Sequence, residues 1–239
     1  MHSSNHHVEA PRTSLALAGA AFALSLILQH IPVLGWLVYP FQLFATLVHE
    51  LSHGLMALFT GGRFIKFTIA PDSSGLATTA GGWRLLVVPA GYLGAALFGG
   101  LLLILTNRSL GTQGRRWMAL GLGLFFAGVT LLFARSFTAI AISGLMAVAL
   151  LALGWYAPPL WLTFALNLLA IQCSLNALDS VTGLVRLNTG PFQLPNDAQT
   201  MANLTYLPAV FWAALWSLTA LALLIGSVYF SLRRPAPQT

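Results

Sequence analysis

The stretch FATLVHELSHGLMALFTGG, residues 44–62, decides how the rest of this sequence is interpreted. The stretch is apolar enough for a membrane helix, yet His-Glu-x-x-His lies at its centre as His49, Glu50 and His53. Two imidazoles and a carboxylate are costly among leucine and alanine side chains unless they have partners. A bound cation is the partner that this set of side chains fits best.

Composition places the chain in a lipid bilayer. Of its 239 residues, 57% are hydrophobic and 7% are charged, against roughly 25% charged in an ordinary soluble domain. The mean hydropathy is +0.81. A soluble core of this size cannot use so much apolar surface. We therefore expect an all-α polytopic protein, an integral multi-pass protein of the cell membrane.

The charge of the chain does not indicate a nucleic-acid partner. The net charge is +6, but the eleven lysines and arginines are scattered between apolar runs. No basic stripe alternates with aromatic residues, so anionic lipid headgroups are the expected counter-charge. The single cysteine, Cys173, excludes an internal disulfide and an all-cysteine zinc site.

Seven apolar stretches reach the length of about 20 residues that crosses a bilayer. They cover 14–38, 41–60, 85–106, 116–134, 136–154, 159–181 and 206–231. Only Arg135 separates the fourth from the fifth, and these two can be one bent unit, so about six to seven transmembrane helices are expected. They form a single domain over 14–232, between a flexible polar tail at 1–13 and a C-terminal tail at 233–239.

Two segments are predicted not to be transmembrane helices. RFIKFTIAPDSSGLATTAGG, residues 63–82, alternates in polarity, turns at PDSSG and continues with threonines. This pattern predicts a short β-hairpin directly after the His-Glu-x-x-His helix. The second segment, residues 186–200, is a loop containing proline and asparagine that ends at a helix cap.

The spacing within the motif predicts a zinc site with one ion per chain. His49 and His53 are four residues apart, so they project from one helical face. Their nitrogens can converge on an ion at ~2.0–2.1 Å. Zinc lowers the pKa of a bound water to ~7, and Glu50 is placed to take its proton and pass it to a leaving amine. The alternative is that the three side chains only hydrogen-bond neighbouring helices.

Two histidines leave a catalytic zinc one protein ligand short. Asp179 is the preferred third ligand, because it lies in NLLAIQCSLNALDSVTGL near the end of the sixth apolar stretch. Gln172, Asn176, Asp179 and Gly183 follow one another at helical spacing and make a polar stripe on an apolar helix. A carboxylate on such a stripe indicates function. Asn176 is a candidate hydrogen-bond donor to a developing oxyanion.

The other two aspartates have ordinary structural interpretations. Asp72 lies in the hairpin turn, and Asp197 follows Pro195-Asn196 at the position of a helix N-cap. Asp197 nevertheless remains an alternative third ligand, and a site without an acidic third ligand is a further alternative.

Two motifs resemble those of the site-2 protease family of intramembrane zinc metallopeptidases. LVHELSHGLMALFTGGRFIKFTI is similar to the first motif, in which an apolar His-Glu-x-x-His helix leads into a Gly-Gly turn and a short hairpin. NALDS resembles the second motif, where an aspartate on a later membrane helix is the third zinc ligand. The resemblance implies His49, His53 and Asp179 as metal ligands and Glu50 as the catalytic base.

The sequence also departs from the family pattern. Ser180 follows Asp179 where glycine is usual, and no soluble PDZ-like insert is present. PAGYLGAALFGG, residues 89–100, and PNDAQTMANLTYLP, residues 195–208, resemble a small, compact branch in which an SDA or NDA segment precedes the final helix.

Together these features predict an intramembrane zinc metalloendopeptidase. It would hydrolyse peptide bonds in or near transmembrane segments of membrane proteins, using a zinc-bound water that Glu50 activates. Its partners would be a transmembrane protein substrate and the lipid bilayer, and the hairpin edge can bind an extended substrate by strand addition. The alternatives are a non-catalytic membrane scaffold with a structural metal site and a transporter whose ionisable residues line an ion path.

Overall fold

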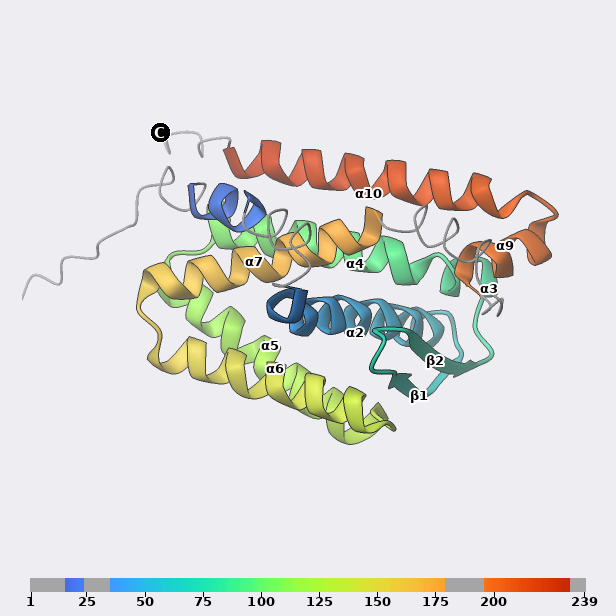
Figure 1. Ribbon diagram of the computed structural model, residues 1–239, viewed down its shortest axis with the longest axis horizontal. Coiled ribbons are helices and arrows are strands. Elements are labelled where there is room, and N and C mark those ends of the chain that lie inside the picture. Colours follow the sequence, from blue (N-terminus) through green and yellow to red (C-terminus); the bar gives the residue numbers. More distant parts are fainter. Residues whose placement is uncertain (1–15, 24–34, 179–195, 233–239) are drawn as a thin grey trace, which may run out of the picture.

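Long helices packed side by side form most of the molecule, and one β-hairpin lies against one end (Figure 1). The computed structural model describes residues 16–23, 35–178 and 196–232. A helix over 16–23 is followed by α2 (Gly35–Phe59), α3 (Arg84–Val87), α4 (Ala90–Ile104), α5 (Thr112–Phe133), α6 (Phe137–Tyr156), α7 (Pro159–Leu178), α9 (Asp197–Thr205) and α10 (Ala209–Leu232). A π-helical turn, η2 (Leu105–Ser109), extends α4.

Within the described residues, five helices are long and apolar enough to cross a membrane. They are Ala90–Arg108, Thr112–Phe133, Phe137–Tyr156, Pro159–Asn176 and Ala209–Ser231. The protein is therefore an integral multi-pass membrane protein, and the predicted helical fold class is confirmed. Helix α2 is not one of the five, in keeping with the polar motif that it carries.

The fourth and fifth predicted stretches are two separate helices. Between α5 and α6 the guanidinium of Arg135 donates to the carbonyl oxygens of Leu132 and Ala134. The hydroxyl oxygen of Ser136 accepts a hydrogen bond from the N–H of Ala139 and so caps α6. These polar contacts satisfy backbone groups that a helix end leaves open, which is why the chain turns sharply here.

The expected boundary between the first two stretches was wrong. Residues 35–38 belong to the motif helix α2, which continues through Pro40. A proline inside a helix costs about 3 kcal/mol, and we attribute its tolerance to the packing of α2 against α4, α6 and α7. The third stretch begins with α3, and Pro89 separates it from α4.

The predicted β-hairpin is confirmed. Strands β1 (Arg63–Ile69) and β2 (Gly75–Ala80) pair antiparallel, with Phe67 opposite Ala77. In the turn, the hydroxyl and the backbone N–H of Ser74 donate to Asp72 and hold the pKa of its carboxyl below the usual value. The outer edge of β1 is occupied, because the carbonyl of Phe67 accepts from the N–H of Arg135. Among the described residues no strand pairs with the outer edge of β2.

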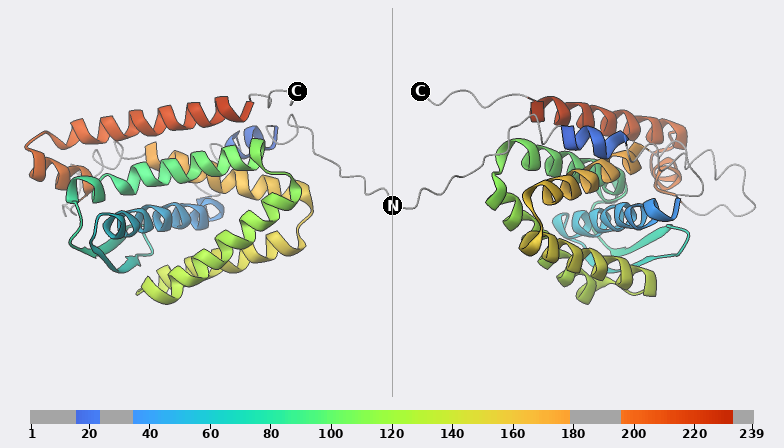
Figure 2. Two further views of the ribbon diagram at one scale, coloured as in Figure 1. Left: turned by 180° about the vertical axis from the view of Figure 1, so that it is seen from behind. Right: turned by 60° about the vertical axis from the view of Figure 1, so that its left-hand side comes forward.

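Small residues let α4 lie close to its neighbours. Gly91, Ala95 and Gly99 follow one another at helical spacing: Ala95 is fully buried, and a Cβ at Gly99 would overlap the Ala170 carbonyl on α7. Helix α10 lies along one side of α4, and α2 lies on the other side (Figures 1 and 2). Helix α4 therefore stands between the motif helix and the C-terminal helix.

Three predicted segments lie wholly or mostly outside the described residues. They are the N-terminal tail at 1–13, the C-terminal tail at 233–239 and most of the loop at 186–200. The helix that ends this loop is α9, and its N-cap is Asn196, whose side-chain oxygen accepts a hydrogen bond from the N–H of Gln199. The N-cap predicted at Asp197 was therefore wrong by one residue.

Candidate metal centre

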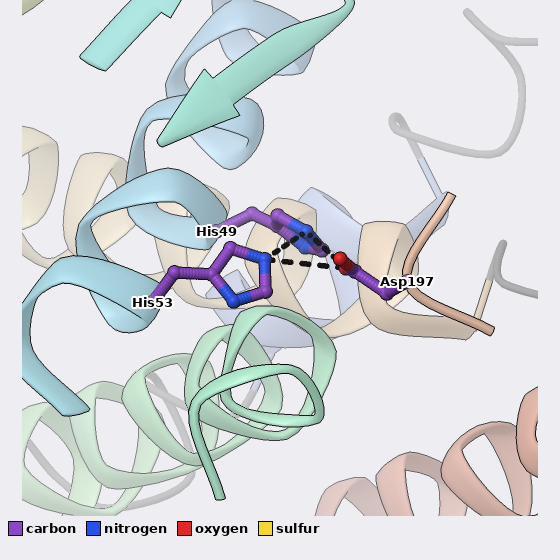
Figure 3. A group of neighbouring side chains, drawn as sticks. All are labelled: His49, His53 and Asp197. Carbon is purple, nitrogen blue, oxygen red and sulfur yellow. Dashed lines mark hydrogen bonds and ion pairs between the residues drawn. The ribbon is translucent and has the colours of Figure 1, made fainter. Parts of the chain in front are cut away.

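The two histidines of the motif present neighbouring nitrogens on one face of α2 (Figure 3). The Nε2 atoms of His49 and His53 lie 3.1 Å apart. The Nδ1–H of His53 donates to the carbonyl oxygen of Val87 at 2.7 Å. That bond orients the ring and leaves Nε2 as the free lone pair, which is the usual arrangement of a metal-binding imidazole.

Asp197 completes a group of three converging donors. Its Oδ2 atom lies 3.0 Å from Nε2 of His49 and 3.2 Å from Nε2 of His53. All three ligand atoms lie within 4.8 Å of one another. Ligands placed 2.0–2.1 Å from one tetrahedral ion are separated by about 3.3 Å. The three donors therefore fit a zinc ion with one coordination position left over.

Asp197 is available as a ligand because it does not cap its own helix. It is the first residue of α9, and Asn196 makes the capping hydrogen bond instead. Burial raises the pKa of the Asp197 carboxyl, but the two imidazoles lower it by more, so the pKa lies below its usual range. The carboxylate form, which binds metal, is thus favoured.

Asp179 lies outside the described residues, so its predicted role as a ligand stays a prediction. Asn176, one turn before it on α7, lies in the described part and lines the same cleft as the two histidines. Among the described residues, the carboxylate that reaches the histidine pair belongs to Asp197, which follows His49 by 148 residues.

Glu50 is buried beside the two histidines and faces the hairpin. Its carboxylate interacts with the backbone of Ala77 on β2. A Cβ placed on Gly75 would overlap the carboxylate oxygen Oε1 of Glu50. The hairpin therefore packs directly on the glutamate, and glycine at the start of β2 permits this approach.

Helix α4 packs directly against the two histidines through Gly91 and Tyr92. A Cβ at Gly91 would overlap the Nε2 atoms of both His49 and His53. The next residue, Tyr92, has its ring centroid 4.6 Å from that of His49, at an interplanar angle of 85°. Tyr92 also stacks on Trp216 of α10, with the ring centroids 5.7 Å apart. The sequence did not predict a role for Tyr92, and its position next to Gly91 was the only available signal.

These side chains line a cleft of about 880 Å³. The cleft is lined by residues of α2, the hairpin, α3 and the start of α4, and α9 contributes Asp197. Figure 1 shows where these elements lie in the fold. Among the described residues, its charged or titratable lining residues are His49, Glu50, His53, Arg84, Tyr92 and Asp197. Such a concave site with converging polar groups is the usual form of a ligand site.

A family model described as Peptidase M50B-like matches residues 16–227. The chain belongs to this peptidase family. The match confirms the resemblance to site-2 proteases that the two motifs indicated. No curated protein and no solved structure matches the chain.

Proposed function

We propose that this member of the Peptidase M50B-like family is an intramembrane zinc metalloendopeptidase that hydrolyses peptide bonds in or near transmembrane segments. One observation carries the proposal: Asp197 meets His49 and His53 at ligand distances, beside the buried carboxylate of Glu50. Two imidazoles and a carboxylate with an open fourth position are the donor set of a catalytic zinc.

We assign His49, His53 and Asp197 as the residues that hold one zinc ion. When bound, zinc polarises a substrate carbonyl as a Lewis acid and lowers the pKa of a coordinated water to about 7. The Val87 carbonyl orients His53, and the ring of Tyr92 packs against His49. Asp179, which the family resemblance implied, is the competing assignment for the third ligand.

Glu50 is the proposed general base and acid. Its carboxylate accepts a proton from the attacking water and then delivers that proton to the leaving amine nitrogen. The contacts with Gly75 and Ala77 hold the carboxylate between the hairpin and the histidine pair. The same contacts shield it from bulk water, which strengthens its electrostatic interactions.

The substrate must enter the cleft as extended chain, because a folded helix uses its carbonyl groups in its own hydrogen bonds. Four residues of β2 line the cleft: Gly75, Leu76, Ala77 and Thr79. We propose that the outer edge of β2 pairs with the substrate by strand addition. The pairing places a substrate carbonyl beside Glu50 and the metal ligands.

The test compares the wild-type protein with the Glu50→Gln variant, both purified in lipid nanodiscs. We expect both to hold about one zinc ion per chain, and only the wild type to cleave a reporter membrane protein with a Gly-containing transmembrane segment. A structural metal site in a scaffold would leave metal content and function unchanged in the variant. A transporter would lose ion flux instead, and a wild-type protein without zinc would refute the proposal.

A further inference from the structure

Arg84 is the one arginine or lysine among the described residues that line the metal cleft. Arg84 is exposed, and no described hydrogen bond or ion pair uses its guanidinium within residues 16–23, 35–178 and 196–232. It is the first residue of α3, and Val87 and Val88 of the same turn also line the cleft. Val87 is the residue whose carbonyl orients His53. Arg84 therefore stands one helical turn from a contact that positions a metal ligand.

Four other arginines of the described chain hydrogen-bond groups of the fold. The guanidinium of Arg116 donates to the carbonyls at the end of α6, and that of Arg135 to carbonyls at the end of α5. Arg108 donates to the carbonyl of Phe230, and Arg115 to the hydroxyl of Thr163. Arg84 differs from these four because it lines the cleft and no hydrogen bond within the described residues uses its guanidinium.

The described acidic residues are already engaged. Glu50 and Asp197 lie at the candidate metal centre, and Asp72 accepts hydrogen bonds from Ser74. With a divalent ion in place, the formal charges of that ion, Glu50 and Asp197 sum to zero. Counted over the described lining residues, Arg84 then leaves the cleft with one net positive charge, which attracts an anionic group of a bound molecule.

We propose that Arg84 forms a specificity subsite that binds an acidic side chain of the substrate, close to the scissile bond. The inference rests on the proposed function, in which an extended polypeptide occupies this cleft. The planar guanidinium matches a carboxylate by two parallel hydrogen bonds, which is the geometry that arginine provides and lysine does not. Arg84 follows Ala80, the last residue of β2, by four residues. The acidic residue of the substrate therefore lies just outside the segment that pairs with β2, next to the C-terminal end of β2.

The test measures binding separately from cleavage. The Glu50→Gln variant is placed in phosphatidylcholine nanodiscs and titrated with fluorescent single-span peptides that have a Gly-rich centre. The peptides differ only in a Glu or a Gln at one position, scanned along the centre. At one position, we expect the Glu peptide to bind about tenfold more tightly than its Gln counterpart.

Two substitutions added to the Glu50→Gln background identify the residue responsible. Arg84→Gln removes the preference for Glu, and Arg84→Glu reverses it in favour of a peptide with Lys at the same position. The matched control is Lys66→Gln, because Lys66 is an exposed cation of the hairpin that does not line the cleft. The control keeps the preference. Equal binding of the Glu and Gln peptides, or no binding of any peptide, overturns the proposal.

A lipid headgroup is the other anion that can meet an arginine at a membrane surface. If Arg84 binds headgroups, replacing part of the phosphatidylcholine with phosphatidylglycerol abolishes the preference, and Arg84→Gln has no effect in phosphatidylcholine alone. That pair of results overturns the subsite. Cleavage by the protein with Glu50 intact separates the two proposals: cleavage without a Glu preference removes only the subsite, whereas a Glu preference without cleavage removes only the peptidase.

Discussion

The Nε2 atom of His49 lies 3.0 Å from the Oδ2 atom of Asp197, although 148 positions separate the two residues in the sequence. The contact joins α2 to α9 and brings the third donor to a pair that the motif already supplied (Figure 3). A short, partly buried contact between an imidazole and a carboxylate also adds to the stability of the fold in the absence of metal.

Replacing Asp197 tests the assignment of the third ligand. We expect Asp197→Asn to weaken zinc binding by at least about 100-fold, since even residues that only contact a ligand contribute 10- to 100-fold. Zinc affinity is measured by competition with a chelating dye. The matched control is Asp179→Asn, which we expect to keep wild-type affinity. The opposite outcome, in which Asp179→Asn loses zinc and Asp197→Asn does not, would restore the assignment implied by the family resemblance.

Adding one methyl group at Gly91 should disrupt the metal centre. The Cβ of Gly91→Ala would overlap the Nε2 atoms of both histidines, so α4 must move away or the rings must turn. We expect zinc content to fall below half of the wild-type value. In Gly144→Ala, where a Cβ meets nothing within 4 Å, zinc content stays unchanged and helix propensity improves by up to about 1 kcal/mol. Full zinc loading of Gly91→Ala would contradict the close approach of α4.

Tyr92 is expected to position His49 through its ring. Tyr92→Ala removes the contact with His49 and the stack on Trp216, and should lower zinc affinity about tenfold. Tyr92→Phe retains both ring contacts and should stay within about threefold of the wild type. Calorimetric titration with zinc compares the two variants. Equal losses in both would show that the hydroxyl, and not the ring, is responsible.

A buried pair of asparagines should stabilise the bundle without affecting the metal. The Asn107 amide donates to the side-chain oxygen of Asn167 at 2.7 Å, and Asn167 donates back at 3.3 Å. Losing one partner leaves a buried polar group, at a cost of about 1–2 kcal/mol. We expect Asn107→Ala to lower the unfolding midpoint in detergent, with zinc affinity unchanged. A change in zinc affinity would indicate that this pair is coupled to the cleft.

Much of the fold is predictable because it follows from short stretches of sequence. A bilayer demands long apolar helices, so composition and run length predict α4–α7 and α10. Alternating polarity around PDSSG predicts the hairpin, since strand pairing follows a two-residue period. The four-residue spacing of His49 and His53 predicts their shared helical face. Each of these features depends on residues that lie close together in the chain.

The sequence by itself determined the membrane class, the motif helix and the hairpin that follows it. Only the tertiary structure decided that Asp197 meets the histidines, that Gly91 and Tyr92 enclose them, and that α5 and α6 are separate helices. The residues around Asp197 are equally compatible with a helix cap and with a metal ligand, because an aspartate near the start of a helix can serve as either. Which role applies depends on the position of α2, and that position is set by the packing of helices distant in sequence.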